Sequence, residues 1–471
     1  MRRGGLLLVA AVTAAGAALR FIGLGASPLW ADEIMSFAAA QLSPAEAARA
    51  ALTQHSIPPL FFWLCHALMS FFGDSEATLR WTSAAAGTLT IPAVWSLLKD
   101  AGATRGGALW GGLLVALNPL HIWFSQEARP YALCTLFAVL AFLYLGRAAR
   151  GSGRWDALGG AACGLLSTMT HSVGLALIPI VWFWWWMEGR RREAVPALAA
   201  ASLLVMSPAV VAWLSAGEDA HAPPRPSSLL EVPYTLFSFV GGFSLGPSVR
   251  ELQTSGAPAL WLRPGQVALG GAAVLAVITL CLKAPSRVAR AWLAAAAVPL
   301  ALTLAGSLVS DYPYNVRYTL LSLPLLLGAA ALGAERAGRL GGIGIGFLLG
   351  VFLLADVQAR LDSRYWKEDS RTASSWFLER LPEGSVVGVA PGYMVGAMTH
   401  YAATRRPPKG LRFVEVDGPQ SVGGLDGLAI TREHHVPDPR GLERRFLEWA
   451  GPGAASGEAV GFRMLARSAR P

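Results

Sequence analysis

The feature that most constrains this chain is a series of apolar blocks, each about twenty residues long, separated by short basic clusters. A helix of ~20 residues rises ~1.5 Å per residue and so crosses the ~30 Å hydrocarbon core of a membrane. Over its 471 residues the chain is 54% hydrophobic and only 15% charged. A soluble domain carries about a quarter charged residues. The pattern therefore predicts a polytopic α-helical membrane protein.

We predict about eleven transmembrane helices. The first is a retained span rather than a signal peptide, because the apolar run after Met1-Arg2-Arg3 is longer than a signal core. The predicted spans are 6–25, 79–98, 106–124, 130–147, 155–170, 172–188, 193–214, 265–283, 288–309, 317–334 and 340–356.

Basic residues between the spans predict the orientation, because short cytoplasmic loops collect Lys and Arg. With the N-terminus inside, fifteen lie in inner segments: Arg2, Arg3, Lys99, Arg105, Arg147, Arg150, Arg154, Arg190, Arg191, Arg192, Lys283, Arg287, Arg290, Arg336 and Arg339. Seven lie in the longer outer segments: Arg49, Arg80, Arg129, Arg225, Arg250, Arg263 and Arg317. This distribution explains the net charge of +9 without a nucleic-acid partner. We expect a multi-pass protein of the inner (plasma) membrane with its C-terminus outside.

Three regions lie outside the predicted spans. A large first outer loop covers 26–78 and includes the short apolar stretch 57–72, which we expect to lie at the outer surface because it is too short to cross. A second outer loop covers 215–262. Residues 359–471 have soluble composition and predict a small C-terminal α/β domain on the outer face, after a transmembrane domain of residues 1–358. Its expected elements are a helix near 365–380, a further helix, and strands near 385–390, 411–416 and 458–466.

The first candidate for chemistry is the acidic pair Asp32-Glu33, just after the first span. Both residues suit the first turn of a helix, where carboxylates interact favourably with exposed N–H groups. An ionisable group at the membrane edge is also a candidate for function. A carboxylate there is able to take a proton from an acceptor hydroxyl as a general base.

The second candidate is the tight outer turn Ser125-Gln126-Glu127-Ala128-Arg129-Pro130-Tyr131. It is interpreted either as a solvated turn, with its proline opening the next helix, or as a site that holds a phosphate or a metal. Glu127 and Arg129 supply the opposite charges, and Gln126 and Tyr131 are further candidates.

The third candidate is the outer turn that contains Asp311 to Tyr318. Arg317 is able to reach the membrane interface without further function, but a guanidinium also matches the geometry of phosphate.

His55, before the sequence SIPPL, is a further candidate for the site. The alternative is that His55 is only a polar residue at the membrane interface.

The four cysteines, Cys65, Cys134, Cys163 and Cys281, lie in apolar segments without CxxC spacing. This favours small core residues over a disulfide or zinc site.

Five stretches of this sequence together resemble a known family. LRFIGLGASPLWADE, HSIPPLFFWL, LRWTSAAAGTL, NPLHIWFSQEARPYAL and NVRYTLLSLPLLL occur in the order seen in bacterial protein O-mannosyltransferase-like glycosyltransferases (family 39-like). The lipid A aminoarabinose transferases belong to the same C-type membrane superfamily. The resemblance covers most of 15–335 and continues weakly into Tyr365–Arg371. SQEARPYAL is its most specific element. Relatives often read HPPLYY where this chain has HSIPPLFF, a departure that bears on the role of His55.

The resemblance implies a polyprenyl-phosphate sugar as donor and inversion at the anomeric carbon. It implies that Asp32, with Glu33 beside it, is the catalytic base and that Glu127 is a second acidic position. Arg317, with Arg129 and Tyr318, is the implied site for the donor phosphate. No cofactor is implied with certainty; some relatives use a divalent metal and others do not, so the metal stays open. The acceptor, whether glycan, lipid or protein, and the sugar also stay open.

The alternative from a different class is a transporter or flippase of lipid-linked sugars that does not catalyse. Such proteins place charges or broken helices at mid-membrane in facing repeats. The polar residues of this chain instead gather between the predicted spans, on the outer side. The sequence therefore favours a glycosyltransferase with its active site on the non-cytoplasmic face.

Overall fold

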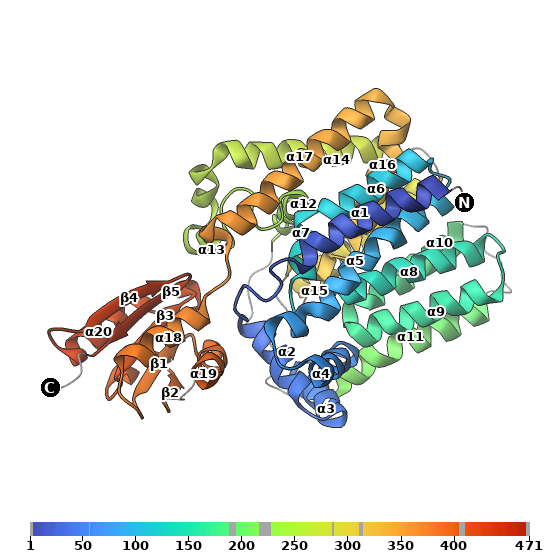
Figure 1. The fold of residues 1–471 in the computed structure, drawn as a ribbon. Helices are drawn as coiled ribbons and strands as arrows, with labels where there is room; N and C mark the ends of the chain where they lie inside the picture. The colour runs from blue at the N-terminus through green and yellow to red at the C-terminus, as the bar shows by residue number, and fades with distance from the viewer. Residues whose placement is uncertain are drawn as a thin grey trace. The chain divides into compact units, whose positions relative to one another are not determined.

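The computed structural model describes residues 3–55, 57–187, 195–215, 228–284, 287–309, 314–404 and 410–467. The chain forms two compact units (Figure 1). Unit 1 comprises Met1–Leu24, Ala39–Gly246 and Pro264–Val357, and unit 2 comprises Gly25–Ala38, Pro247–Arg263 and Gln358–Pro471. Unit 2 thus joins two segments of the predicted outer-loop regions to the C-terminal residues. The predicted division into residues 1–358 and 359–471 stays a prediction.

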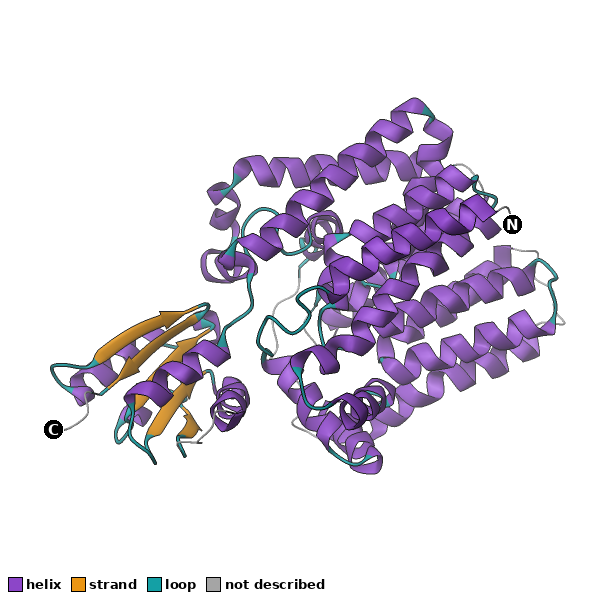
Figure 2. Cartoon of the chain, viewed as in Figure 1, coloured by secondary structure: helices purple, strands orange, loops and turns teal. Residues whose placement is uncertain are grey.

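Unit 1 consists of helices (Figure 2). Its α-helices are α1 (Arg3–Phe21), α3 (Pro44–His55), α4 (Leu60–Phe72), α5 (Glu76–Asp100), α6 (Arg105–Leu117), α7 (Pro119–Ser125), α8 (Tyr131–Ala149), α9 (Arg154–Thr170), α10 (Leu177–Met187), α11 (Val195–Ser215), α12 (Glu231–Gly241), α14 (Pro264–Lys283), α15 (Arg287–Val309), α16 (Ser322–Ala337) and α17 (Arg339–Leu361). Two 3₁₀ helices matter below, η1 (Ser172–Ala176) and η5 (Val316–Thr319). Helix α2 (Ala31–Gln41) begins in unit 2.

Six helical segments of the described residues are long and apolar enough to cross a membrane. They are Gly4–Phe21, Tyr131–Ala148, Leu198–Ser215, Pro264–Lys283, Ala289–Val309 and Arg339–Leu361, and the bent pair α6–α7 makes a seventh if it counts as one span. A helix lies on the described part of each of the eleven predicted segments. The chain is therefore a mainly helical, multi-pass type of protein, as predicted.

The predicted single span 106–124 is wrong in one respect, because it consists of two helices that meet at 57°. Pro119 has no N–H to continue the ladder of α6, and its ring disfavours helical geometry at the preceding residue. Asn118 has extended backbone angles and caps α7, because its side chain accepts from the N–H of His121. The Asn-Pro pair thus ends one helix and starts the next.

The apolar stretch near 57–72 forms α4, a helix of 13 residues. Its inner side is fully buried at Phe61, Phe62 and Cys65, while Phe71 and Phe72 near its end are largely exposed. This length is too short to cross a membrane as a helix. Its predicted place at the outer surface stays a prediction.

Unit 2 contains a five-stranded mixed sheet in the order β2-β1-β3-β5-β4. The strands are β1 (Val386–Ala390), β2 (Arg412–Glu415), β3 (Gly427–Thr431), β4 (Ala455–Ala459) and β5 (Phe462–Ala466). β1 runs parallel to β2 and β3, and β5 runs antiparallel to β3 and β4. The predicted strand near 458–466 covers parts of two strands, because the chain turns at Gly461 with a positive φ of 76°.

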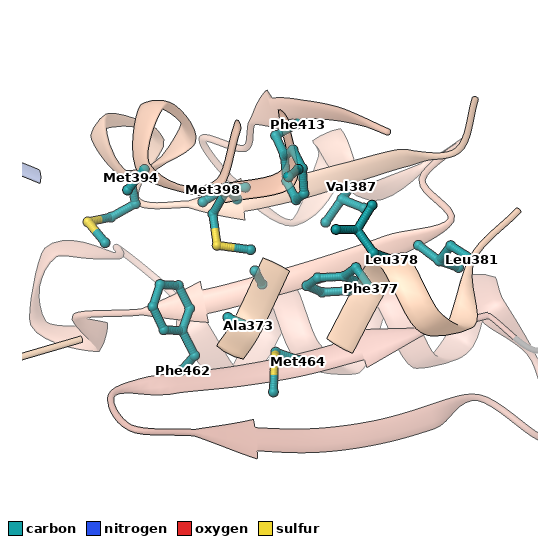
Figure 3. Close-up of a cluster of buried hydrophobic side chains, with 14 of the residues drawn as sticks. Ala373, Phe377, Leu378, Leu381, Val387, Met394, Met398, Phe413, Phe462 and Met464 are labelled. Carbon is teal, nitrogen blue, oxygen red and sulfur yellow. The ribbon is translucent and has the colours of Figure 1, made fainter. Parts of the chain in front are cut away.

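Helices cover both faces of this sheet. Because successive strand side chains point to opposite faces, Val387 and Val389 pack under α18 (Ser370–Arg380) and α19 (Val395–Thr404), as Figure 3 shows in part. Leu428 and Ile430 face the other way, toward α20 (Pro439–Ala450). Ala31 and Ile34 of α2 also pack against the first of these two cores. The start of α2 is therefore built into unit 2.

Candidate functional site

The acidic pair begins α2, within unit 2. Glu33 is fully buried, and its Oε2 accepts a hydrogen bond from the backbone N–H of Trp30 at 3.4 Å. The N–H of Glu33 donates in turn to the carbonyl of Trp30 at 2.9 Å, which closes the first turn. Asp32 is half-buried, and its carbonyl accepts from the hydroxyl of Ser36. The two acids therefore differ: Glu33 closes the helix start, and Asp32 is the acid with access to solvent.

Trp30 also lies within a group of charged residues of unit 2. The Nζ of Lys367 lies 5.3 Å from the Trp30 ring centroid, and the Cζ of Arg432 lies at the same distance. Arg432 forms a bidentate pair with the buried Glu368, at 2.8 and 3.1 Å. Burial alone would raise the pKa of Glu368, but the Arg432 guanidinium holds that pKa below its usual value. These contacts join the weakly matching stretch Tyr365–Arg371 to the residues just before Asp32.

The turn after α7 is held on both sides within unit 1. The Nε2 of Gln126 donates to the carbonyls of Leu19 and Arg20, each at 3.2 Å. The hydroxyl of Ser83 donates to the carbonyl of Arg129 at 3.0 Å. Glu127 is only 3% exposed and Arg129 only 4%. This turn is therefore not a solvated loop, because both of its charged side chains are buried.

Three aromatic rings surround the other predicted phosphate ligand, Arg317. Its Cζ lies 5.2 Å from the ring centroid of Tyr318 and 5.6 Å from that of Tyr131. The rings of Tyr131 and His171 are 5.1 Å apart, and those of His171 and Tyr318 are 5.9 Å apart. Arg317 also donates to the hydroxyl of Tyr318 at 3.3 Å. We call Arg129, Tyr131, His171, Arg317 and Tyr318 the arginine–aromatic cluster.

His171 reports the electrostatics of this cluster. It lies between α9 and η1, and its Nδ1 accepts from the N–H of Val173 at 3.1 Å. Burial, together with the positive charges of Arg129 and Arg317, lowers the pKa of His171 to about 3. The imidazole is therefore neutral at physiological pH. The charges of both guanidinium groups contribute to this shift, and positive charge of this kind suits an anion.

The structure thus brings together most of the predicted unit 1 residues: Arg129, Tyr131, Arg317 and Tyr318 meet around His171, with Gln126 and Glu127 in the same turn as Arg129. Asp32 and Glu33 belong to unit 2. His55 ends α3, and its side chain lies outside the described residues, as do Asp311, Tyr312 and Pro313. Among the residues that are described, no group of three or more His, Cys, Asp or Glu side chains is arranged to hold a metal.

Sequence reasoning missed two buried residues beside this turn, Arg20 and His121. Arg20 is fully buried near the end of α1, and its guanidinium lies 2.9 Å from the Nδ1 of His121. An arginine inside an apolar block was the available signal, since a charge there is costly unless it is used. His171 is not among the predicted residues either, because a lone histidine in a short turn shows no partner in the sequence.

Comparison with known proteins places the chain in a class. Residues 56–214, about a third of the chain, match the family model described as dolichyl-phosphate-mannose-protein mannosyltransferase. That region contains the turn after α7 and His171, but not Asp32 or Arg317. No curated protein sequence matches the chain significantly.

Solved structures extend the likeness over the whole chain. ArnT from Cupriavidus metallidurans in the apo state has a TM-score of 0.56 and 13% sequence identity, covering 98% of this chain and 98% of that one. The apo oligosaccharyltransferase of Archaeoglobus fulgidus has a TM-score of 0.56 at 12% identity, covering 99% and 75%. AglB of the same organism, in complex with an inhibitory peptide and a dolichol-phosphate, has a TM-score of 0.54 at 11% identity, covering 99% and 74%.

The chain therefore has the fold of ArnT and of the Archaeoglobus fulgidus oligosaccharyltransferase. The resemblance to the protein O-mannosyltransferase-like and ArnT-like proteins, which the sequence motifs indicated, is confirmed.

Proposed function

We propose that this protein is a glycosyltransferase that moves a sugar from a polyprenyl-phosphate donor to an acceptor on the non-cytoplasmic face of the inner membrane. The observation that carries the proposal is the arginine–aromatic cluster, in which Arg317 lies against the rings of Tyr131 and Tyr318 and both rings lie beside the buried His171. Positive charge among helices of this apolar content is expensive unless it has a use. A phosphate attached to a membrane-soluble chain is a ligand that needs both positive charge and apolar surroundings.

The comparisons support a lipid-linked donor. A solved protein of this fold holds a dolichol-phosphate, and the matching family model is described by a dolichyl-phosphate-linked sugar. Whether the sugar is a hexose or a pentose stays open, as does the acceptor, whether glycan, lipid or protein.

In this proposal the arginine–aromatic cluster binds the donor phosphate. Arg317 and Arg129 pair with its oxygens, and the hydroxyl of Tyr318, already bonded to Arg317, adds a donor. Glu127, in the same turn as Arg129, is the second acidic position, with Gln126 and Tyr131 as further contacts. Fixed positive groups favour the charge that grows on the departing phosphate, and such groups act most strongly where water is excluded.

The base in this proposal is Asp32, with Glu33 holding the helix start that carries it. Asp32 takes the proton of the acceptor hydroxyl, and the hydroxyl oxygen attacks the anomeric carbon from the side opposite the phosphate. The bond from that carbon to the phosphate oxygen breaks, and polyprenyl phosphate leaves with the electron pair. Attack from the opposite side inverts the anomeric configuration. A divalent metal at the phosphate stays an open question.

The proposed topology has eleven spans, with the acidic pair, the turn after α7 and Arg317 on the outer side. The support is the excess of basic residues in the other set of loops. Reporter fusions at Gly25, Arg129 and Tyr314 test it. All three should report the non-cytoplasmic compartment, and a cytoplasmic report from one of them would contradict the proposal.

The activity is tested with purified protein in vesicles that contain radiolabelled polyprenyl-phosphate sugar and a mixed acceptor fraction. We expect release of free polyprenyl phosphate together with transfer of label to an acceptor. Movement of the sugar lipid across the bilayer without cleavage would instead identify a flippase and overturn the proposed function.

A further inference from the structure

The guanidinium of Arg20 has a complete set of hydrogen-bond acceptors inside unit 1. A guanidinium carries five N–H donors and accepts nothing. Arg20 is 0% exposed, and its five acceptors are the carbonyls of Gly16 (2.8 Å), Ala116 (3.0 Å) and Val115 (3.0 Å), Oγ of Ser125 (3.2 Å) and Nδ1 of His121 (2.9 Å). One side chain of α1 thus joins the end of α6 to α7.

The two α6 carbonyls are ones that the helix itself leaves unpaired. In an uninterrupted helix the carbonyl of Val115 would accept from residue 119, but Pro119 has no N–H. The carbonyl of Ala116 lies in the same last turn, where helix carbonyls lack partners within the helix. Arg20 supplies the missing donors and so stabilises the 57° bend between α6 and α7.

The turn after α7 in turn supplies hydrogen-bond donors to the end of α1. Gln126 donates to the carbonyls of Leu19 and Arg20 in the last turn of α1. Ser125, beside it, accepts from the Nε of Arg20 and donates to the carbonyl of His121. Each helix end is therefore capped by a side chain of the other, and the linked residues directly precede Glu127 and Arg129.

The hydrogen bond from Arg20 determines which ring nitrogen of His121 carries the proton. Because Arg20 only donates, Nδ1 of His121 must accept, and its proton therefore lies on Nε2. No described residue accepts from that Nε2. The neutral ring is thus fixed by the guanidinium, and Asn118 fixes the start of the same helix by donating to the carbonyl of Phe239 at 2.7 Å.

We propose that Arg20 is a positioning residue: through the α6–α7 bend it sets the place of the Ser125–Arg129 turn. It does not touch the donor, and it acts by holding the segment that carries Glu127 and Arg129. The proposal rests on the proposed function for its effect on sugar transfer, but the structural link from Arg20 to the turn is tested separately.

The structural test is hydrogen–deuterium exchange of the full-length protein in detergent. In Arg20→Lys the charge is kept, but three donors from one nitrogen cannot serve five acceptors. We expect backbone exchange over residues 120–131 to rise about tenfold or more, because each tenfold rise corresponds to a 1.4 kcal/mol cheaper opening. Arg147→Lys is the matched control, since Arg147 pairs with Asp100 elsewhere in unit 1, and it should leave that segment unchanged. Unchanged exchange in Arg20→Lys would overturn the proposal.

Milder variants at Ser125 and His121 keep the test decisive if Arg20→Lys fails to fold. Ser125→Ala removes the bond from the guanidinium to the turn, together with the bond from Ser125 to the carbonyl of His121, and should raise exchange in the same segment by a smaller factor. His121→Asn keeps an acceptor near the position of Nδ1, whereas His121→Leu removes it. His121→Asn should therefore resemble wild type more closely than His121→Leu; equal behaviour of the two would contradict the role of this bond.

The functional test uses kcat/KM for the donor. A displacement of about 1 Å in a catalytic segment lowers rates by up to ~10²-fold, and we expect a loss of that order in Arg20→Lys. If Arg20 acts through the turn, the double variant with Glu127→Gln will lose less than the product of the two single losses. Losses that multiply would indicate a general structural role and overturn the positioning role. If wild-type protein transfers no sugar, the proposed function fails, while the exchange result still decides the link.

Discussion

Arg20 and Arg317 of unit 1 have different partners from Arg432 and Arg263 of unit 2. In unit 1, Arg20 is bonded to carbonyls, a hydroxyl and a neutral imidazole, and Arg317 lies against the rings of Tyr131 and Tyr318. In unit 2, Arg432 is paired with the carboxylate of Glu368. Arg263 likewise contacts Glu251, at 3.4 Å.

This difference bears on the charge that each arginine presents. Carbonyls, hydroxyls and rings satisfy a guanidinium without cancelling its charge. Burial is the main cause of the low pKa of His171, and the charges of Arg129 and Arg317 add to it. A bidentate carboxylate cancels the charge of Arg432 and leaves a stabilising contact. This contrast supports the proposed binding of the donor phosphate in unit 1, while the proposed base, Asp32, belongs to unit 2.

The largest effect is expected for Asp32→Asn, which keeps size and polarity but removes the proposed base. Its kcat should fall about 10²–10⁴-fold while donor binding persists. Glu33→Gln is the matched control at the neighbouring position. Because Glu33 closes the helix start, this variant should lower stability more than it lowers kcat. Sugar transfer from the labelled donor measures both. A folded Asp32→Asn protein that transfers sugar at the wild-type rate would refute the assignment of the base.

The next effect is expected for Arg317→Gln, which removes a positive group from the arginine–aromatic cluster. Loss of one fixed donor to a developing oxyanion lowers kcat by about 10²–10³-fold. Arg317→Lys should recover only part of this loss, because lysine lacks the planar fork that matches phosphate. Affinity for polyprenyl phosphate, measured without turnover, should fall in parallel. Unchanged affinity in both variants would remove unit 1 as the phosphate site.

A smaller effect is expected from the ion pair of unit 2. Glu368→Gln leaves the guanidinium of Arg432 without its carboxylate and should destabilise unit 2 by about 2–3 kcal/mol, less than a fully buried pair because Arg432 is partly exposed.

The same pair predicts a pH dependence. Because the folded pKa of Glu368 is depressed, its contribution to stability is present above the unfolded value near ~4.3 and is lost as the pH falls through the folded value. Thermal unfolding of wild type should therefore weaken below about pH 4 more steeply than that of Glu368→Gln. Parallel pH profiles of the two proteins would show that the pair does not stabilise unit 2.

The smallest effect is expected for Tyr314→Phe in unit 1. The hydroxyl of Tyr314 bonds to Oγ1 of Thr235 at 2.6 Å and so ties the segment before η5 to α12. Burial raises the pKa of Tyr314, so the hydroxyl stays protonated at neutral pH. Loss of one neutral hydrogen bond lowers stability by about 0.5–1.5 kcal/mol. Transfer activity should change less than in Arg317→Gln; a larger loss would give Tyr314 a direct role in the site.

Much of the fold was predictable because it depends on local composition. Blocks of apolar residues predicted the helices of unit 1, and the change to soluble composition after α17 predicted the strands that became β1 and β2. The bend at Asn118-Pro119 was not predicted, although its cause is local, because Pro119 lacks the N–H that would continue α6. The arrangement of β3 between β1 and β5 could not be predicted, since strand order depends on residues far apart in the chain.

The sequence by itself determined which residue types were available: an acidic pair after the first apolar block, a turn with Glu127 and Arg129, and Arg317 before α16. Only the tertiary structure decided that Arg129 and Arg317 act on the same histidine, that Glu33 closes a helix start, and that Arg20 joins α1 to the α6–α7 bend. The reason is physical: composition sets whether a segment enters a membrane, but the partner of a buried charge is chosen by whichever acceptors the packed helices bring within 3 Å or so.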